Sequence, residues 1–253
     1  MATGADATVE VVITGLKRVR ELDDGRVRAR VRTWPGEPHT AHLVLADHTM
    51  VASPATLHDW LNRLAQHGYT LVRTGALSPD AARAFTEQGF APIQELALLR
   101  RDLSRHDTFG APSHQLRPLR SSRALAAAAR IDHAAFEAPW HLDENGITEA
   151  LDATPHSRIR LAVNANDDPA GYLITGRNGA VGFIQRLAVD PEHEGQGVAS
   201  SLMCDGLAWL ARRGVREVLV NTHFDNTRAL RLYARFGFVL VDEQLTVLEW
   251  VVS

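Results

Sequence analysis

A glycine-bearing turn in the second half of the chain has the residue types needed to hold a phosphate group. Residues 194–200 follow a predicted strand at residues 183–189 and lead directly into an apolar helical pattern. Gly195 and Gly197 let the backbone approach a ligand closely, and Ala199 keeps the start of the helix small. Backbone N–H groups at a helix start, together with the helix dipole, favour a bound phosphate or pyrophosphate. The turn therefore predicts an anion site where this helix begins.

A second group of residues lies on the helix predicted to follow Asn226. Asn226 is a suitable N-cap, Tyr233 lies on the helix, and Gly237-Phe238 ends it. A phenol has a pKa of about 10 and can donate a hydrogen bond or a proton to a reacting group when the site positions it well. The alternative is that Tyr233 is only a half-buried helix aromatic. Its spacing from Asn226 and the nearby glycine turn favour the functional interpretation.

Together these residues resemble the motifs of the GNAT superfamily of acyl-CoA N-acyltransferases. The family's phosphate turn has Gln or Arg, two residues, Gly, one residue, then Gly or Ala. Gly197 and Ala199 match this pattern, whereas Glu194 stands at the Gln/Arg position. Because an acidic side chain there would repel phosphate, we expect Glu194 to point away while backbone groups bind. The second family motif matches at Asn226 and Tyr233.

The resemblance implies an α/β (α+β) fold with mixed twisted sheets flanked by helices. It also implies direct transfer of acetyl from acetyl-CoA to a primary amine. In similar enzymes the strand before the turn pairs with pantetheine amides, the matching tyrosine protonates the leaving thiolate, and backbone N–H groups near Val189 polarise the carbonyl. The implied cofactor-binding residues are Leu187, Ala188, Val189, Glu194, Gly195, Gln196, Gly197, Val198, Ala199, Ser200, Asn226 and Tyr233.

A general base must also remove a proton from the attacking amine. The strand before Asn226 offers Asn221, with His223 just beyond it. We take Tyr233 as the general acid and His223 as the candidate base. The alternative for His223 is a packed or capping side chain.

The acceptor side of the site is expected near residues 136–144. Glu137, Asp143 and Glu144 lie in the segment that usually shapes the family's acceptor pocket, beside Trp140. The run at residues 136–140 resembles the ribosomal-protein alanine acetyltransferases but is too short to fix a substrate. The acceptor is therefore left open between a small amine or amino-sugar conjugate and a protein N-terminus.

Bulk properties favour a cytoplasmic protein. The 253 residues carry a net charge of −3 and contain one cysteine, Cys204, which suits a reducing compartment. No apolar run approaches the roughly 20 residues needed to span a bilayer, and no signal segment is expected. Histidine spacing predicts no metal site. We therefore expect no membrane partner, and either a monomer or a homodimer.

A basic segment near the N-terminus raises the question of nucleic acid. Arg26, Arg28, Arg30 and Arg32 alternate with apolar residues, and Lys17, Arg18 and Arg20 precede them. A period of two is typical of a strand with one solvated face and one buried face. We prefer this interpretation and expect no nucleic-acid partner.

The two halves of the chain read as copies of one unit. Residues 68–89 and 214–237 have nearly the same length, each with strand, helix and a closing glycine. Two strands, at residues 238–241 and 245–252, are expected to close the sheet. We predict a degenerate GNAT-like domain at residues 1–106, a linker at 107–114 and a catalytic domain at 115–253, a layout resembling mycothiol synthase.

The first copy lacks the chemistry of the second. Phe85 stands where the second copy has Tyr233, Ser78 replaces Asn226, and no glycine turn precedes its first helix. We expect a structural half that does not catalyse. Two rival functions remain: an acyl-CoA-binding regulator without turnover, which Glu194 favours, and a nucleic-acid module, which would bind with steep salt dependence.

Overall fold

The computed structural model describes residues 21–46 and 50–252. The strand expected at residues 9–13 and the basic residues Lys17, Arg18 and Arg20 lie outside this part. Within it, all strands join one mixed sheet in the order β1-β2-β3-β4-β11-β5-β10-β9-β8-β7-β6. The α/β class with a mixed sheet flanked by helices is confirmed.

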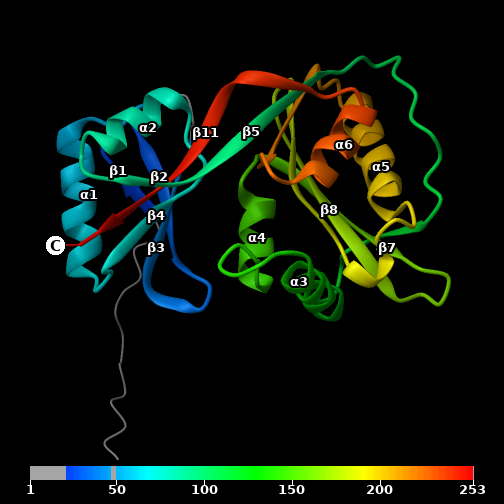
Figure 1. Ribbon diagram of the computed structural model, residues 1–253, viewed down its shortest axis with the longest axis horizontal. Coiled ribbons are helices and arrows are strands. Elements are labelled where there is room, and N and C mark those ends of the chain that lie inside the picture. The colour runs from blue at the N-terminus through cyan, green and yellow to red at the C-terminus, as the bar shows by residue number, and fades with distance from the viewer. Residues whose placement is uncertain (1–20, 47–49, 253) are drawn as a thin grey trace, which may run out of the picture.

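The chain forms its elements in two runs, one in each half (Figure 1). The first run is β1 (Glu21–Asp23), β2 (Arg28–Trp34), β3 (Glu37–Leu45), α1 (Pro54–Gln66), β4 (Leu71–Thr74), α2 (Pro79–Thr86) and β5 (Ala91–Asp102). The second run is β6 (Gln115–Pro118), α3 (Ser122–Ala135), α4 (Glu144–Asp152), β7 (His156–Val163), β8 (Pro169–Asn178), β9 (Val181–Val189), the short 3-10 helix η1 (Pro191–His193), α5 (Val198–Arg212), β10 (Glu217–His223), α6 (Thr227–Arg235) and β11 (Val239–Val251).

The internal repeat extends to the way the helices end. After α6, the Phe238 N–H donates to the Tyr233 carbonyl at 3.0 Å, and the two rings lie 5.7 Å apart. After α2, the Phe90 N–H donates to the Phe85 carbonyl at 3.3 Å, with rings 5.0 Å apart. Both are Schellman ends with the accompanying apolar contact. The aromatic residue after the closing glycine therefore fixes the matching aromatic on each helix.

The two halves exchange their last strands. β3 and β4 are parallel, as are β9 and β10, but β4 continues to β11 and β10 continues to β5, both antiparallel. β5 and β11 also pair with each other and run side by side across the middle of the molecule (Figure 1). Each half therefore completes its sheet with a strand from the other. The expectation of two closing strands was wrong: β11 is a single strand with an irregularity between Leu240 and Gln244.

The second half buries its sheet on both faces. On β8, Leu173 belongs to the apolar cluster under α5 and α6, whereas Tyr172 and Ile174 belong to the cluster under α3 and α4. Because successive strand side chains point to opposite faces, these two helix pairs cover opposite sides of the sheet. The first half has its own cluster beneath α1 and α2, which includes Trp60 and Phe85.

The segment with alternating arginines, residues 26–32, buries its apolar side chains, as its period of two predicted. Val27, Ala29 and Val31 are buried. Two arginines on the other face reach the second half: Arg30 donates to the Asp152 carbonyl at 2.6 Å, and Arg32 pairs with Glu149 at 2.9 Å. Arg30 and Arg32 on this side of β2 thus contact the second half.

A stack of aromatic and cationic side chains completes this contact. Trp34 donates from Nε1 to the Pro139 carbonyl at 2.9 Å, and its ring lies 5.6 Å from that of Trp140. The guanidinium of Arg73 lies 4.4 Å from the Trp34 ring and pairs with Glu249 at 2.8 Å. The first half therefore supports the loop between α3 and α4, where the acceptor side of the site was predicted.

Candidate active site

The strands β9 and β10 separate along their length. They pair only between Val181, Gly182 and Phe183 on β9 and Glu217, Val218 and Leu219 on β10. Beyond this point β9 pairs with β8, and β10 pairs with β5. In the first half, by contrast, β3 pairs with β4 along the whole of β4. Only the second of these parallel pairs opens into a gap.

The predicted strand residues line this gap. Leu187, Ala188 and Val189 pair on one edge with Leu173, Tyr172 and Gly171 of β8. Their backbone groups on the β10 side have no strand partner among the described residues. A bound amide chain could add to this edge as a further strand would.

The glycine turn after β9 has the expected backbone geometry. Gly195 and Gly197 have φ values of 73° and 86°, a region that side chains with a Cβ rarely adopt. Gly197 is the N-cap of α5 and makes no side-chain cap, and the first helical bond runs from the Ser201 N–H to the Gly197 carbonyl at 3.0 Å. The N–H groups of Val198, Ala199 and Ser200 therefore lie at the start of the helix without intrahelical acceptors.

Side chains of the turn and of the predicted linker lie beside this helix start. Gln196 folds back and donates from Nε2 to the Glu192 carbonyl at 3.1 Å. The end of the predicted linker lies against the first turn of α5, where the Ser113 N–H donates to the Ser201 hydroxyl at 3.0 Å. Glu194 forms an ion pair with Arg228 of α6. The acidic side chain thus has a cationic partner on the opposite side of the gap.

Asn226 and Tyr233 occupy the predicted positions on α6. The Ala229 N–H donates to the Asn226 side-chain oxygen at 3.0 Å, so Asn226 is the N-cap. Tyr233 is 5% exposed, and its ring packs against Phe238. Gly237 has a φ of 75°, which allows the Schellman end that brings Phe238 onto Tyr233. Burial raises the pKa of Tyr233 to about 12, and the charge of Arg186 acts in the opposite direction.

His223 ends β10 with its ring partly engaged. The Asp225 N–H donates to Nδ1 at 3.2 Å, and the Asp225 carboxylate lies 3.5 Å from the same nitrogen. A nitrogen that accepts an N–H carries a lone pair, so the ring proton of the neutral form is on Nε2.

A buried carboxylate that the sequence analysis missed lies behind the site. Asp132 of α3 is fully buried and accepts two bonds from Arg186 of β9, at 2.7 Å and 2.6 Å. It also accepts from the Tyr172 hydroxyl and from the Leu142 N–H, each at 2.5 Å. Burial and the Asp132 charge raise the pKa of Tyr172 well above its usual value. This network joins α3, β8, β9 and the loop between α3 and α4.

The position of Asp132 in the sequence could have revealed it. Asp132 lies next to Ile131 and four residues after Ala128, both fully buried on the apolar stripe of α3. A charged residue on such a stripe is almost never fully buried unless it is paired. Arg186 was the partner to seek, because it is a charged residue within an apolar strand.

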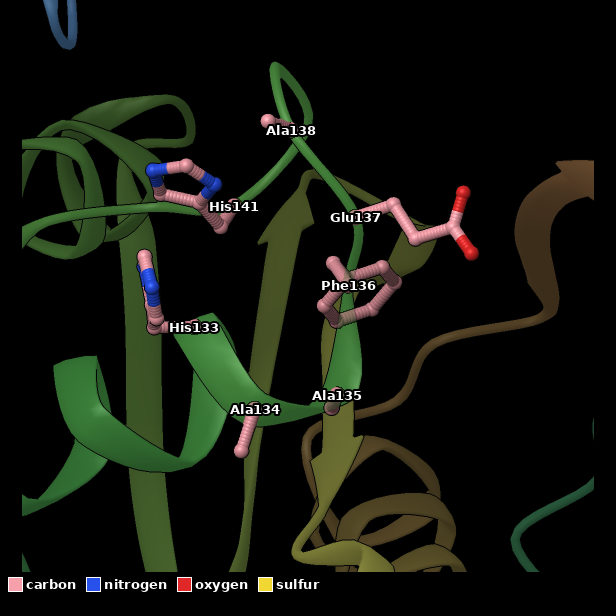
Figure 2. Close-up of a pocket in the computed structure, with 7 residues that line it drawn as sticks. All are labelled: His133, Ala134, Ala135, Phe136, Glu137, Ala138 and His141. Atoms are coloured by element: carbon pink, nitrogen blue, oxygen red, sulfur yellow. The ribbon is translucent and has the colours of Figure 1, made fainter.

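A pocket of about 490 Å³ lies where α3 leads into the loop between α3 and α4. Figure 2 shows His133 and His141 side by side, with the Glu137 carboxylate directed away from both. The two imidazole rings are 4.4 Å apart. The Arg186 guanidinium lies 3.5 Å from the centre of the Phe136 ring, so the buried network also supports one wall of the pocket. The two imidazoles therefore lie together at the pocket, whereas the Glu137 carboxylate is directed away from them.

The described part of the chain has neither a cluster of metal-binding side chains nor a membrane-spanning helix. Among the residues that the structure describes, no three His, Cys, Asp or Glu side chains are arranged to hold a metal ion. No helix in this part of the chain has the length and apolar character needed to cross a membrane.

Comparison with known proteins agrees with this geometry. The model of the acetyltransferase (GNAT) family matches residues 125–238. The mycothiol acetyltransferase of Actinosynnema mirum is 30% identical over 165 residues, covering 59% of this chain and 53% of that protein. The mycothiol acetyltransferase of Mycobacteroides abscessus is 31% identical over 178 residues, covering 64% and 58%. The chain spans little more than half the length of these relatives.

Solved structures support the fold across both halves. A tandem GNAT protein from the clavulanic acid biosynthesis pathway superimposes with a TM-score of 0.64 at 17% identity, covering 89% of this chain and 78% of that one. The open strand pair, the glycine turn and the tyrosine helix all lie within the residues that this family model matches. The family model covers less than half of the chain, residues 125–238, and the fold of the chain is similar to that of the tandem GNAT protein.

Proposed function

We propose that this protein transfers acetyl from acetyl-CoA to a primary amine. The observation that carries the proposal is the open gap between β9 and β10, with the glycine turn at its end and Tyr233 on the helix that follows β10. The edge of β9 suits the pantetheine amides, and the start of α5 suits the pyrophosphate. Coenzyme A carries both groups in one molecule.

The reaction would proceed by direct attack. The amine nitrogen forms a bond to the thioester carbonyl carbon, and the tetrahedral intermediate then expels the CoA thiolate. Tyr233 donates a hydrogen bond from its hydroxyl to the departing sulphur, and the proton lost by the amine passes through His223 or water and is finally taken up by the thiolate. The products are the acetylated amine and free CoA thiol. Backbone N–H groups near Val189 would stabilise the oxyanion.

The raised pKa of Tyr233 refines its role. The raised pKa of Tyr233 makes complete transfer of its proton to a thiolate less favourable than the ordinary pKa of about 10 would. Tyr233 therefore acts chiefly by donating a hydrogen bond to the sulphur as its negative charge develops. Position matters more than acidity for this role.

The acceptor is proposed to approach from the loop between α3 and α4. The pocket there is lined by two imidazoles, which can form hydrogen bonds with a polar amine. The relatives named mycothiol acetyltransferase favour a small amino-sugar or thiol conjugate. A protein N-terminus is the other acceptor class.

We also propose that the first half is structural. Its parallel strands β3 and β4 remain paired, and its helix α2 carries the fully buried Phe85 in the place of Tyr233. The degenerate copy would be residues 1–106, with a linker at 107–114 and the catalytic copy at 115–253. Its contribution would be β5 and the support of the acceptor loop.

An assay of CoA thiol release across a panel of amines tests the proposal. The panel contains an amino sugar, a cysteine–amino-sugar conjugate and an alanine-terminated peptide, each incubated with acetyl-CoA. We expect release that depends on one class of amine, with a matching acetylated product by mass spectrometry. Acetyl-CoA binding without transfer to any amine would instead support the regulator, the alternative that Glu194 favours.

A further inference from the structure

Glu194 and Arg228 face each other across the mouth of the gap. Glu194 lies in the turn after β9, and Arg228 lies in the first turn of α6, which follows β10. Their ion pair joins the two sides at the end where the strands are no longer paired. The contact therefore spans the end of the gap that carries the glycine turn.

The side chains of Glu194 and Arg228 are both exposed enough for Arg228 to exchange the carboxylate for another partner. The side chain of Arg228 is 69% exposed and that of Glu194 is 37% exposed. Exposed ion pairs contribute little to stability, because water solvates both charges well. A doubly charged pyrophosphate held by backbone N–H groups would be a stronger partner for the guanidinium than one carboxylate.

The turn alone carries no basic side chain. Between Asp190 and Ser200 the charged residues are acidic, apart from the partly buried His193. Gln196 donates to the Glu192 carbonyl and so is directed back into the turn. Arg228 is the arginine that the structure brings to the turn from another element.

We propose that Arg228 supplies the cationic group of the phosphate site and that Glu194 holds it across the gap until pyrophosphate displaces the carboxylate. This assignment rests on the proposed use of acetyl-CoA. It explains how an acidic residue can occupy this turn: Glu194 positions the arginine in the free protein and releases it to the ligand. The pair is a latch that the cofactor opens.

Binding of acetyl-CoA by calorimetry tests the latch in wild type, Glu194→Gln and Arg228→Gln. We expect Arg228→Gln to raise Kd about 5–20-fold, since a charge-assisted bond to phosphate is lost. Glu194→Gln should lower Kd about 2–5-fold, because the competing carboxylate is gone. Arg235→Gln removes the same charge at the other end of α6 and should change Kd less than 2-fold.

Truncated ligands locate the effect on the pyrophosphate. S-acetylpantetheine, which lacks phosphate, should bind wild type and Arg228→Gln equally. Acetyl-dephospho-CoA, which keeps the pyrophosphate but lacks the 3′-phosphate, should retain the full effect of Arg228→Gln. Loss of the effect with this ligand would overturn the assignment to pyrophosphate.

Two failures can be told apart in the same experiment. If wild type does not bind acetyl-CoA, the proposed function fails. If wild type binds and Arg228→Gln matches Arg235→Gln, the latch fails and the proposed function stands.

Discussion

Replacing Asp132 by asparagine is expected to cost about 3–5 kcal/mol of unfolding free energy, the range for breaking a buried ion pair. Asp132 is fully buried and accepts bonds from Arg186, Tyr172 and Leu142. An amide leaves the Arg186 charge unpaired and turns an NH₂ group toward groups that are themselves donors. Urea unfolding followed by circular dichroism measures the loss.

Asp167→Asn is the matched control. Asp167 also pairs with an arginine, Arg117, but the two side chains are about half exposed. An exposed pair contributes at most about 1 kcal/mol, so the control should change stability little. A double variant, Asp132→Asn with Arg186→Met, should lose less than the sum of the two single variants. Equal losses for Asp132→Asn and Asp167→Asn would contradict the assigned role of the buried network.

Tyr233→Phe is expected to lower kcat about 10- to 150-fold. This is the range for losing a hydrogen bond to a charged group, about 1.5–3 kcal/mol. Because the hydroxyl acts on the developing thiolate, KM for acetyl-CoA should change little. The measurement is steady-state thiol release with the amine identified by the panel.

Tyr69→Phe provides the control for this variant. Tyr69 is as buried as Tyr233, at 5% exposed, and its hydroxyl lies 3.0 Å from the Thr33 hydroxyl in the first half. The same chemical change there should leave kcat within about 2-fold of wild type. Equal rates for wild type and Tyr233→Phe would remove Tyr233 from the mechanism.

The pH dependence follows from the pKa of Tyr233. Burial raises this pKa from 10 to about 12, so the neutral, donating form persists at least to pH 10. Between pH 6 and 10 the rate should rise as the acceptor amine loses its proton, without a fall from tyrosine ionisation. A fall near pH 9 that disappears in Tyr233→Phe would contradict the raised pKa.

Local chemistry made the core of the site predictable from the sequence. The turn at Gly195 and Gly197, the N-cap at Asn226 and the glycine end at Gly237 each depend on residues close together in the chain. Backbone sterics and capping fix such features with little help from tertiary packing. The structure has all of them at the predicted positions.

Long-range pairing was beyond the same reasoning. The strand exchange places β5 between β10 and β11, and hydrophobic periodicity does not distinguish it from an unexchanged pairing. Arg186 donates to Asp132, which lies 54 residues away in the sequence. Arg228 and Glu194, which form an ion pair, belong to α6 and to the turn after β9. Of these four residues only Glu194 was singled out from the sequence, and the partner of each became visible only in the fold.

The central claim is that only the second half, through the gap between β9 and β10, holds acetyl-CoA. Calorimetric titration of the full chain measures the number of molecules bound. We expect one acetyl-CoA to bind per chain. Gly197→Val should weaken the affinity for acetyl-CoA at least about tenfold, because a β-branched residue is strained at a φ of 86°. Two molecules per chain, or unchanged affinity in Gly197→Val, would contradict it.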